Sequence, residues 1–74
     1  MPIDLIVELR CIQNKDGSYN AGAFENGKQI IADDDFFVHE GNCDAIAALY
    51  RKLRAAYPGV PVLVVGSCLK CIFA

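Results

Sequence analysis

The period of the hydrophobic residues changes twice along this chain, and this change limits the fold more than any other feature. Residues 3–11 alternate apolar and polar side chains, which is typical of a strand with one buried face. Residues 46–57 instead place apolar side chains three and four apart, which indicates a helix with one apolar stripe. Residues 60–65 form an apolar run that favours a strand covered on both faces. The pattern therefore predicts a mixture of strands and helix.

Two turn signals divide the first half of the chain into three strands. Gly17 lies in a polar segment and tolerates a positive φ at low cost. Asn26-Gly27 is typical of a type I′ turn, which needs two residues with positive φ. We therefore expect an antiparallel meander with strands over residues 3–11, 18–24 and 28–32. Residues 36–38 are apolar again and form either a short strand extension or a plug over the core.

A helix and a closing strand complete the predicted fold. Asn42 can cap the helix by accepting from a free backbone N–H, and Asp44 suits the positive end of the helix dipole. Pro58-Gly59 ends the helix. The order β-β-β-α-β would place the closing strand parallel to the first, and residues 69–73 are compatible with a fifth short strand. We predict a single compact α+β domain over residues 1–74.

The chain has four cysteines, which allow two disulfides, a metal site or buried thiols. They are Cys11, Cys43, Cys68 and Cys71. Each stands where a small apolar residue would fit, and the first residues do not resemble a secretion signal. We therefore expect four reduced thiols, a cytoplasmic location and no cofactor or metal. Cys68 and Cys71 have the spacing of half a zinc site, which leaves a small zinc-stabilised domain as an alternative.

Composition and charge disfavour several classes of function. The net charge is −2, whereas a nucleic-acid binder of this size is usually clearly basic. The longest apolar run is far shorter than the roughly 20 residues that span a membrane. No nucleotide-binding or hydrolase motif occurs, and nothing suggests a nucleophile or a pocket for His39-Glu40. We expect a protein that is not an enzyme and that contacts neither nucleic acid nor membrane directly.

The candidates for partner binding are the charged residues of an acidic and a basic cluster. They are Asp33, Asp34, Asp35, Glu40, Arg51, Lys52 and Arg54. Adjacent carboxylates repel one another unless a basic surface neutralises them, so the acidic cluster could engage such a surface. A solvated turn and a solvated helix face are the alternative explanation of the two clusters. The apolar content of 54% slightly exceeds what a small monomer can bury, so we also expect a homodimer.

Three motifs follow one another along the chain, with an alanine-rich helix before the last of them. They are Gly17-Ser18-Tyr19, Asn26-Gly27-Lys28 and Val62-Leu63-Val64-Val65-Gly66-Ser67. This arrangement resembles certain small phage anti-CRISPR proteins. The resemblance implies a non-enzymatic inhibitor that blocks a CRISPR–Cas or other nucleic-acid-handling complex through surface contacts in the host cytoplasm. In that role Asp33 to Asp35 would take the place of phosphates.

The same order of strands and helix also resembles the partial RNase H-like domain of the HicB antitoxin family. This resemblance implies an antitoxin or regulatory module as the alternative function. That family carries a Pro-Asp-Leu-Pro-Gly-Cys loop before its helix, whereas residues 36–41 here are Phe-Phe-Val-His-Glu-Gly. Gly66-Ser67 stands where RNase H would have a catalytic aspartate, so no nuclease activity is implied.

Overall fold

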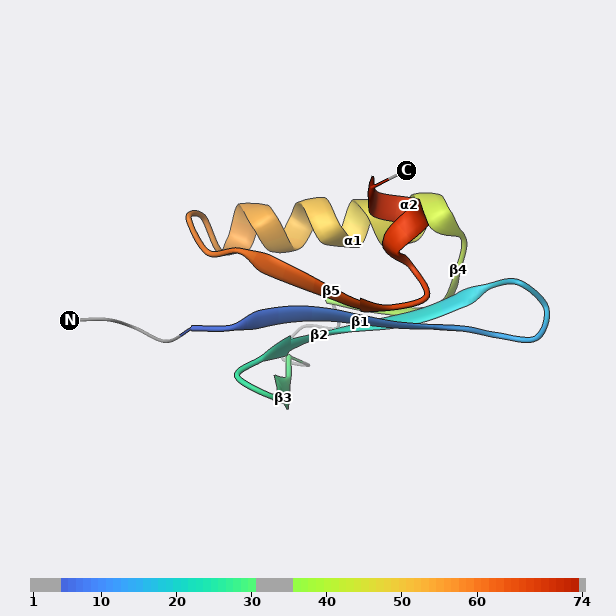
Figure 1. Cartoon of the computed structure of the whole chain (residues 1–74), viewed down its shortest axis with the longest axis horizontal. Coiled ribbons are helices and arrows are strands. Elements are labelled where there is room, and N and C mark those ends of the chain that lie inside the picture. The colour runs from blue at the N-terminus through green and yellow to red at the C-terminus, as the bar shows by residue number, and fades with distance from the viewer. Residues whose placement is uncertain (1–4, 31–35, 74) are drawn as a thin grey trace.

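The computed structural model describes residues 5–30 and 36–73, and it places two helices on one side of a mixed sheet (Figure 1). The strands are β1 (Val7–Gln13), β2 (Tyr19–Glu25), β3 (Lys28–Gln29), β4 (Phe37–Gly41) and β5 (Val62–Gly66). The helices are α1 (Cys43–Ala56) and α2 (Leu69–Phe73). The α+β class that the sequence predicts is therefore confirmed.

The sheet has the order β3-β2-β1-β5, and β4 also pairs with β2. Because β1 occupies the other edge of β2, β3 and β4 share one edge. The two residues that flank the segment 31–35 both hydrogen-bond to Ala23 of β2. The N–H of Ile30 donates to the Ala23 oxygen (2.9 Å), and the N–H of Ala23 donates to the Phe36 oxygen (3.0 Å). At the other side of the sheet, β5 runs parallel to β1, with Leu9 level with Val64. The predicted parallel pairing of the first and last strands is thus confirmed.

Local chemistry explains both hairpin turns. Asn26 and Gly27 have φ values of 51° and 86°, as the predicted type I′ turn requires. In the first turn, the Asp16 carboxylate accepts from both the N–H (2.9 Å) and the hydroxyl (2.6 Å) of Ser18. These hydrogen bonds stabilise the ionised form and lower the pKa of Asp16 below its usual value. The turn residues therefore fix how β1, β2 and β3 follow one another.

The core lies between the sheet and α1. Val7 and Leu9 of β1 are fully buried, and small Ala21 and Ala23 lie beside them on β2. The helix contributes its apolar stripe, whose buried members are Ile46, Leu49 and Leu53. The small side chains of β2 leave room for the larger ones of the helix, so both layers fill one core. The stripe predicted from the sequence is the buried face of α1.

The start of α1 follows the prediction. The side chain of Asn42 accepts from the N–H of Ala45 at 3.0 Å, and Asp44 lies in the first turn. The cap satisfies a backbone donor that the helix itself leaves without a partner. At the other end, the N–H of Tyr57 donates to the Leu53 oxygen at 3.0 Å, and Gly59 has a φ of 80°. Helix α1 therefore begins and ends where its flanking residues dictate.

The third predicted strand is confirmed over β3 (Lys28–Gln29) but does not include Ile30, and the rest of its predicted range lies outside the described residues. Two other predictions about the strands are wrong. Strand β5 is covered on one face only, since Leu63 and Val65 are exposed. Residues 69–73 form the short helix α2 instead of a strand. The sequence left residues 36–38 as either a short strand or a plug over the core, and the structure shows a strand, β4.

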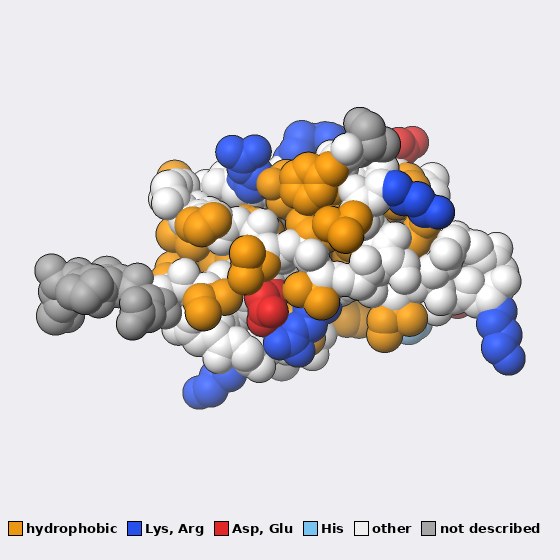
Figure 2. Space-filling view, in the orientation of Figure 1, with side chains coloured by type: hydrophobic (Ala, Val, Ile, Leu, Met, Phe, Trp, Pro, Cys, Tyr) orange, Lys and Arg blue, Asp and Glu red, His pale blue; other side chains and the backbone are white. Residues whose placement is uncertain are grey.

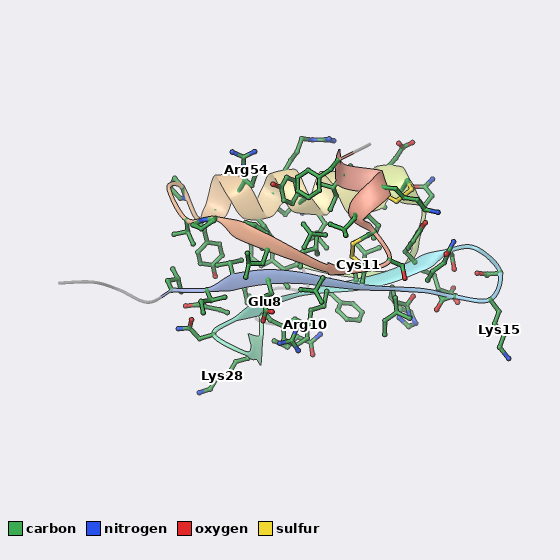
Figure 3. The ribbon with its side chains drawn as sticks, in the orientation of Figure 1. Glu8, Arg10, Cys11, Lys15, Lys28 and Arg54 are labelled. Carbon is green, nitrogen blue, oxygen red and sulfur yellow. A yellow bond between two sulfur atoms is a disulfide. The ribbon has the colours of Figure 1, made fainter. Side chains whose placement is uncertain are left out.

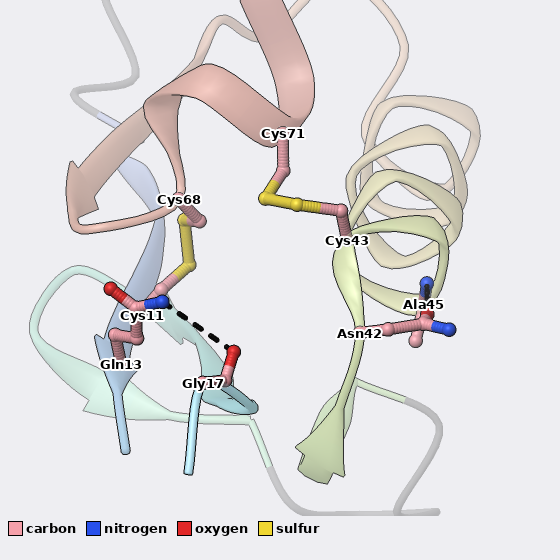
Figure 4. The surroundings of a disulfide bond; sticks show 8 residues. All are labelled: Cys11, Gln13, Gly17, Asn42, Cys43, Ala45, Cys68 and Cys71. Atoms are coloured by element: carbon pink, nitrogen blue, oxygen red, sulfur yellow. Dashed lines mark hydrogen bonds between the residues drawn. A yellow bond between two sulfur atoms is a disulfide. The ribbon is translucent and has the colours of Figure 1, made fainter. Parts of the chain in front are cut away.

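The expectation of four reduced thiols is also wrong, because the structure pairs all four cysteines (Figure 4). Cys11 and Cys68 have Cα atoms 5.8 Å apart, and those of Cys43 and Cys71 are 5.0 Å apart, both within the range that a disulfide spans. The parallel register brings the first pair together by setting Cys11 level with Gly66. The turn into α2 then carries Cys71 to the start of α1. Topology, which residue spacing does not reveal, decides this pairing.

Candidate protein-binding surface

One face of the sheet carries no helix among the described residues, since α1 and α2 both lie on the other side (Figure 1). We call this side the open face. Its residues come from alternate positions of β1, β2, β4 and β5. Among them are Glu8, Arg10, Ile12, Gly22, Phe24, Phe37, Leu63 and Val65. The labelled Glu8 and Arg10 side chains in Figure 3 point away from the helices, as this alternation requires.

The open face exposes large apolar side chains. Ile12 is 70% exposed, Leu63 49%, Val65 45% and Phe37 40%. Single exposed apolar residues are common on proteins, but a group of them on one face marks an interaction surface. Ile12, Leu63 and Val65 lie on the paired strands β1 and β5, and Phe37 on β4 shares a hollow with Ile12, so the four side chains lie on one face.

Among the described residues, the two charged side chains that β1 places on this face pair with each other. The guanidinium of Arg10 lies 2.9 Å from the Glu8 carboxylate and also over the Phe24 ring, 4.1 Å from its centroid. Such a pair is worth little stability at a surface, about 0–1 kcal/mol. The pair changes the chemical character of the surface more than it changes the stability. Glu8 and Arg10 neutralise one another, and the arginine lies against an aromatic ring. The β1 part of the open face therefore remains nearly neutral.

A shallow hollow of about 230 Å³ lies on the open face beside Gly22. A Cβ atom at Gly22 would come within 3.3 Å of the Gln29 amide nitrogen and 3.4 Å of the Phe37 ring. The missing side chain therefore makes the room into which Gln29 and Phe37 settle. Arg10, Ile12 and Phe24 complete the wall. The hollow is smaller than most small-molecule pockets, which are about 300–1,000 Å³, but it can accept one protruding side chain of a partner.

Of the predicted site residues, the structure describes Glu40, Arg51, Lys52 and Arg54, and it places Glu40 apart from the three basic residues. Asp33, Asp34 and Asp35 lie outside the described residues. Glu40 is exposed on β4, where it has a φ of 66° and its N–H donates to the Asn20 side chain at 2.9 Å. Glu40 precedes α1, whereas the basic residues lie toward the end of that helix. Each helical residue advances about 1.5 Å along the axis, so the helix itself separates Glu40 from the basic residues.

The basic residues are on the helix side of the molecule. Arg51, Lys52 and Arg54 are exposed on α1, and Figure 3 shows Arg54 on the far side of the helix from Glu8 and Arg10. The Arg54 guanidinium lies 5.8 Å from the centroid of the Tyr50 ring, which turns the side chain along the helix surface. These residues therefore form a separate, solvated helix face.

Sequence reasoning missed the open face. The apolar run of residues 60–65 suggested burial on both faces, and Ile12 lies beyond the end of the predicted first strand. The signal was present in β1, where the polar positions Glu8 and Arg10 are followed in the same alternation by apolar Ile12. An apolar residue at a solvent-facing position of a strand is the feature that could have identified this surface.

Two other polar groups make local contacts in the part of the chain that the structure describes. His39 is exposed and stacks on Phe37, with ring centroids 6.0 Å apart. The Tyr57 hydroxyl donates to the Glu25 carboxylate at 3.0 Å, and partial burial with this acceptor raises the pKa of Tyr57. No buried polar or charged side chain occurs among these residues.

Within the described ranges, neither helix combines the length and apolar character needed to cross a bilayer. No protein-family model, curated protein or solved structure matches the chain significantly. The chemistry of its own surfaces is therefore what indicates the function of this chain.

Proposed function

We propose that this protein is a non-catalytic binding domain that engages a protein partner through the open face of its sheet. The observation that carries the proposal is the exposure of Ile12, Phe37, Leu63 and Val65 on one side of a sheet whose other side is filled by the helices. Burial of these side chains against a partner would remove apolar surface from water at about 25 cal/mol for each Å².

The chemistry of the open face favours a protein over other ligands. A nucleic acid would need several unpaired cations for its phosphates, but Arg10 is already paired with Glu8. A small molecule would need a deeper pocket than the hollow beside Gly22. An apolar surface with one hollow, on which the charges of β1 are paired, instead suits an aliphatic or aromatic anchor on a partner protein.

The non-catalytic part of the proposal rests on the polar residues. An active site usually holds buried titratable groups whose pKa values are shifted toward the working pH. The shifts in the described residues concern Asp16, which accepts from Ser18 in an exposed turn, and the half-buried Tyr57, and both shifts move the pKa away from neutral pH. The zinc-stabilised alternative loses support, because sulfur atoms joined in disulfides do not act as thiolate ligands.

The partner class to test first is the one implied by the anti-CRISPR resemblance, a CRISPR–Cas surveillance complex. An antitoxin module would instead bind a toxin. The two disulfides favour an oxidising compartment, because cytosolic thiols are kept reduced. The cytoplasmic location stays a prediction that this pairing opposes. An inhibitor that acts in a cytoplasm must therefore also bind after its disulfides are reduced.

The test is co-elution of the protein with a purified surveillance complex, with and without reductant. We expect the double variant Ile12→Ser, Phe37→Ser to reduce binding at least about tenfold, since it removes two apolar contacts. Leu69→Ser is the matched control, because Leu69 is as exposed as Leu63 but lies on α2. A second arm tests the two charged clusters. It changes the acidic Asp33, Asp34 and Asp35 and the basic Arg51, Lys52 and Arg54 to alanine.

The outcomes separate the two parts of the proposal. Absence of co-elution in both redox states rejects the inhibitor function. The second outcome concerns the binding surface. If co-elution survives the open-face variant but is lost in the alanine variant of the charged residues, the open face is rejected as the binding surface and the charged clusters become the candidates again.

A further inference from the structure

The two edges of the sheet differ in how well they are protected against pairing with another strand. The β3–β4 edge is polar and irregular: it carries Lys28, His39 and Glu40, the positive φ of Glu40 and a break in register between Tyr19 and Ala21. Charges and bulges are the usual means by which proteins prevent edge-to-edge association. Strand β5 at the opposite edge carries no charge, because Val62–Gly66 contains only valine, leucine and glycine, and its one positive φ is at the terminal Gly66.

The backbone of β5 also has hydrogen-bonding groups that point outward. The N–H of Ser67 donates to the Cys11 oxygen at 3.3 Å, which directs Ser67 toward β1. Backbone groups alternate in direction along a strand, so Leu63 and Val65 also bond toward β1. Val62, Val64 and Gly66 therefore direct their N–H and C=O groups away from the sheet. No strand of residues 5–30 or 36–73 pairs with this outer edge.

Apolar side chains flank this edge on both sides. Leu63 and Val65 lie on the open face, while Leu69 (49% exposed) and Phe73 (61% exposed) belong to α2. Figure 2, which views the molecule from the β5 side, shows hydrophobic side chains gathered over β5 and α2. A strand that docks here would be covered by apolar contacts above and below its backbone.

We propose that β5 pairs in antiparallel fashion with β5 of a second copy of this chain, so that one sheet continues through a symmetric dimer. The outward-pointing residues are symmetric about Val64, so a two-fold axis at Val64 pairs it with itself and Val62 with Gly66 of the second copy. The same axis places Leu63 opposite Val65. A second copy fits because it brings an equally uncharged strand and equally apolar flanks, which a charged edge would not.

This dimer goes beyond the proposed function, because it uses the β5 edge and leaves the hollow beside Gly22 open in both copies. It also supplies the side-chain burial that a strand pair alone lacks. A specific interface needs about 1,000 Å² or more, and two strands of five residues reach that only with flanking side chains. Leu63, Val65, Leu69 and Phe73 from both copies are the side chains available for this purpose.

The experiment is sedimentation velocity of the oxidised protein at concentrations up to roughly 1 mM, where even weak pairing is populated. We expect the wild type to reach twice the 8.1 kDa of one chain. Leu63→Lys and Val65→Glu, each alone, should weaken dimerisation about a hundredfold, because each places a charge opposite an apolar side chain. The register sets Leu63 level with Glu8 and Val65 level with Arg10, so each new charge has an opposite charge beside it and the monomer should stay folded.

The double variant Leu63→Lys, Val65→Glu tests the register itself. Antiparallel pairing about Val64 sets each new lysine opposite a new glutamate of the second copy, so we expect dimerisation to recover to within about tenfold of the wild type. Ile12→Lys is the matched control on the same face, and it should remain dimeric because it lies beyond the strand pair.

A monomeric wild type over the whole concentration range overturns the proposal. A dimer that is unaffected by Leu63→Lys, or one that the double variant fails to restore although circular dichroism shows it to be folded, overturns the β5 pairing. Dimer formation and partner binding are measured separately, so failure of the β5 pairing leaves the open-face proposal standing and is distinct from its failure.

Discussion

The two faces of β1 use the same seven residues in opposite ways. Val7, Leu9 and Cys11 point toward the helices and are almost completely buried, whereas Glu8 and Ile12 point to the open face and Ile12 is 70% exposed. Both faces contain apolar side chains, so hydrophobicity alone does not separate them. What separates them is whether another layer lies over them. The covered face stabilises the fold, and the open face leaves apolar surface available for a partner.

A matched pair of leucines should give the largest difference between the two faces. Leu9→Ala removes a fully buried side chain and should lower the free energy of unfolding by about 2–5 kcal/mol. Leu63→Ala on the adjacent strand should cost less than about 1 kcal/mol, because Leu63 is half exposed. Urea denaturation of the oxidised protein at low concentration, where dimerisation does not contribute, measures both values. Equal losses would mean that the open face is covered in solution.

A matched pair of glycines sharpens the comparison with a smaller effect. Gly66 has a φ of 106°, and a Cβ there would meet the backbone oxygen of Cys11, so Gly66→Ala should cost at least about 1–3 kcal/mol. Gly22 has an ordinary φ, and its Cβ would meet only the side chains of Gln29 and Phe37. Gly22→Ala should therefore change stability little while it fills the hollow. Thermal denaturation compares the two variants; a larger loss for Gly22→Ala would contradict the described hollow.

The sequence alone predicted the local features but not the ones that depend on tertiary contact. The turn at Asn26-Gly27, the cap at Asn42 and the parallel closing strand follow from residue chemistry and chain order, and all are confirmed. The cysteine pairing was missed because it depends on the register that sets Cys11 beside the turn after β5. Helix α2 was missed because its five residues contain no buried side chain and therefore no strong periodic pattern.

The candidate surface was missed for a related reason. An apolar strand reads the same in a sequence whether its two faces are both covered or only one is. Residues 60–65 therefore suggested a buried strand, and only the placement of both helices on one side reveals that Leu63 and Val65 are exposed. Charged clusters, by contrast, are visible in any sequence, and so they attracted the prediction of a binding site.

The smallest predicted effect concerns the end of the covered face, where the Tyr57 hydroxyl donates to Glu25. Partial burial and this acceptor raise the pKa of Tyr57 above its usual 10.0. The folded protein holds the proton more tightly than the unfolded chain, so the stabilisation is fully present below pH 10 and is lost as the pH rises through the raised pKa. Tyr57→Phe should cost about 1 kcal/mol at neutral pH and should reduce the loss of stability at alkaline pH.

Urea denaturation at neutral pH and above pH 10 measures this prediction, with Tyr50→Phe as the control. Tyr50 lies on α1 in a T-shaped ring contact with Phe73, and the hydrogen bond to Glu25 comes from Tyr57 instead. If Tyr57→Phe and the wild type lost stability in parallel at alkaline pH, the hydrogen bond to Glu25 would not be the link between α1 and the end of β2. Apolar packing would then be the contact that holds the end of β2 against the helix layer.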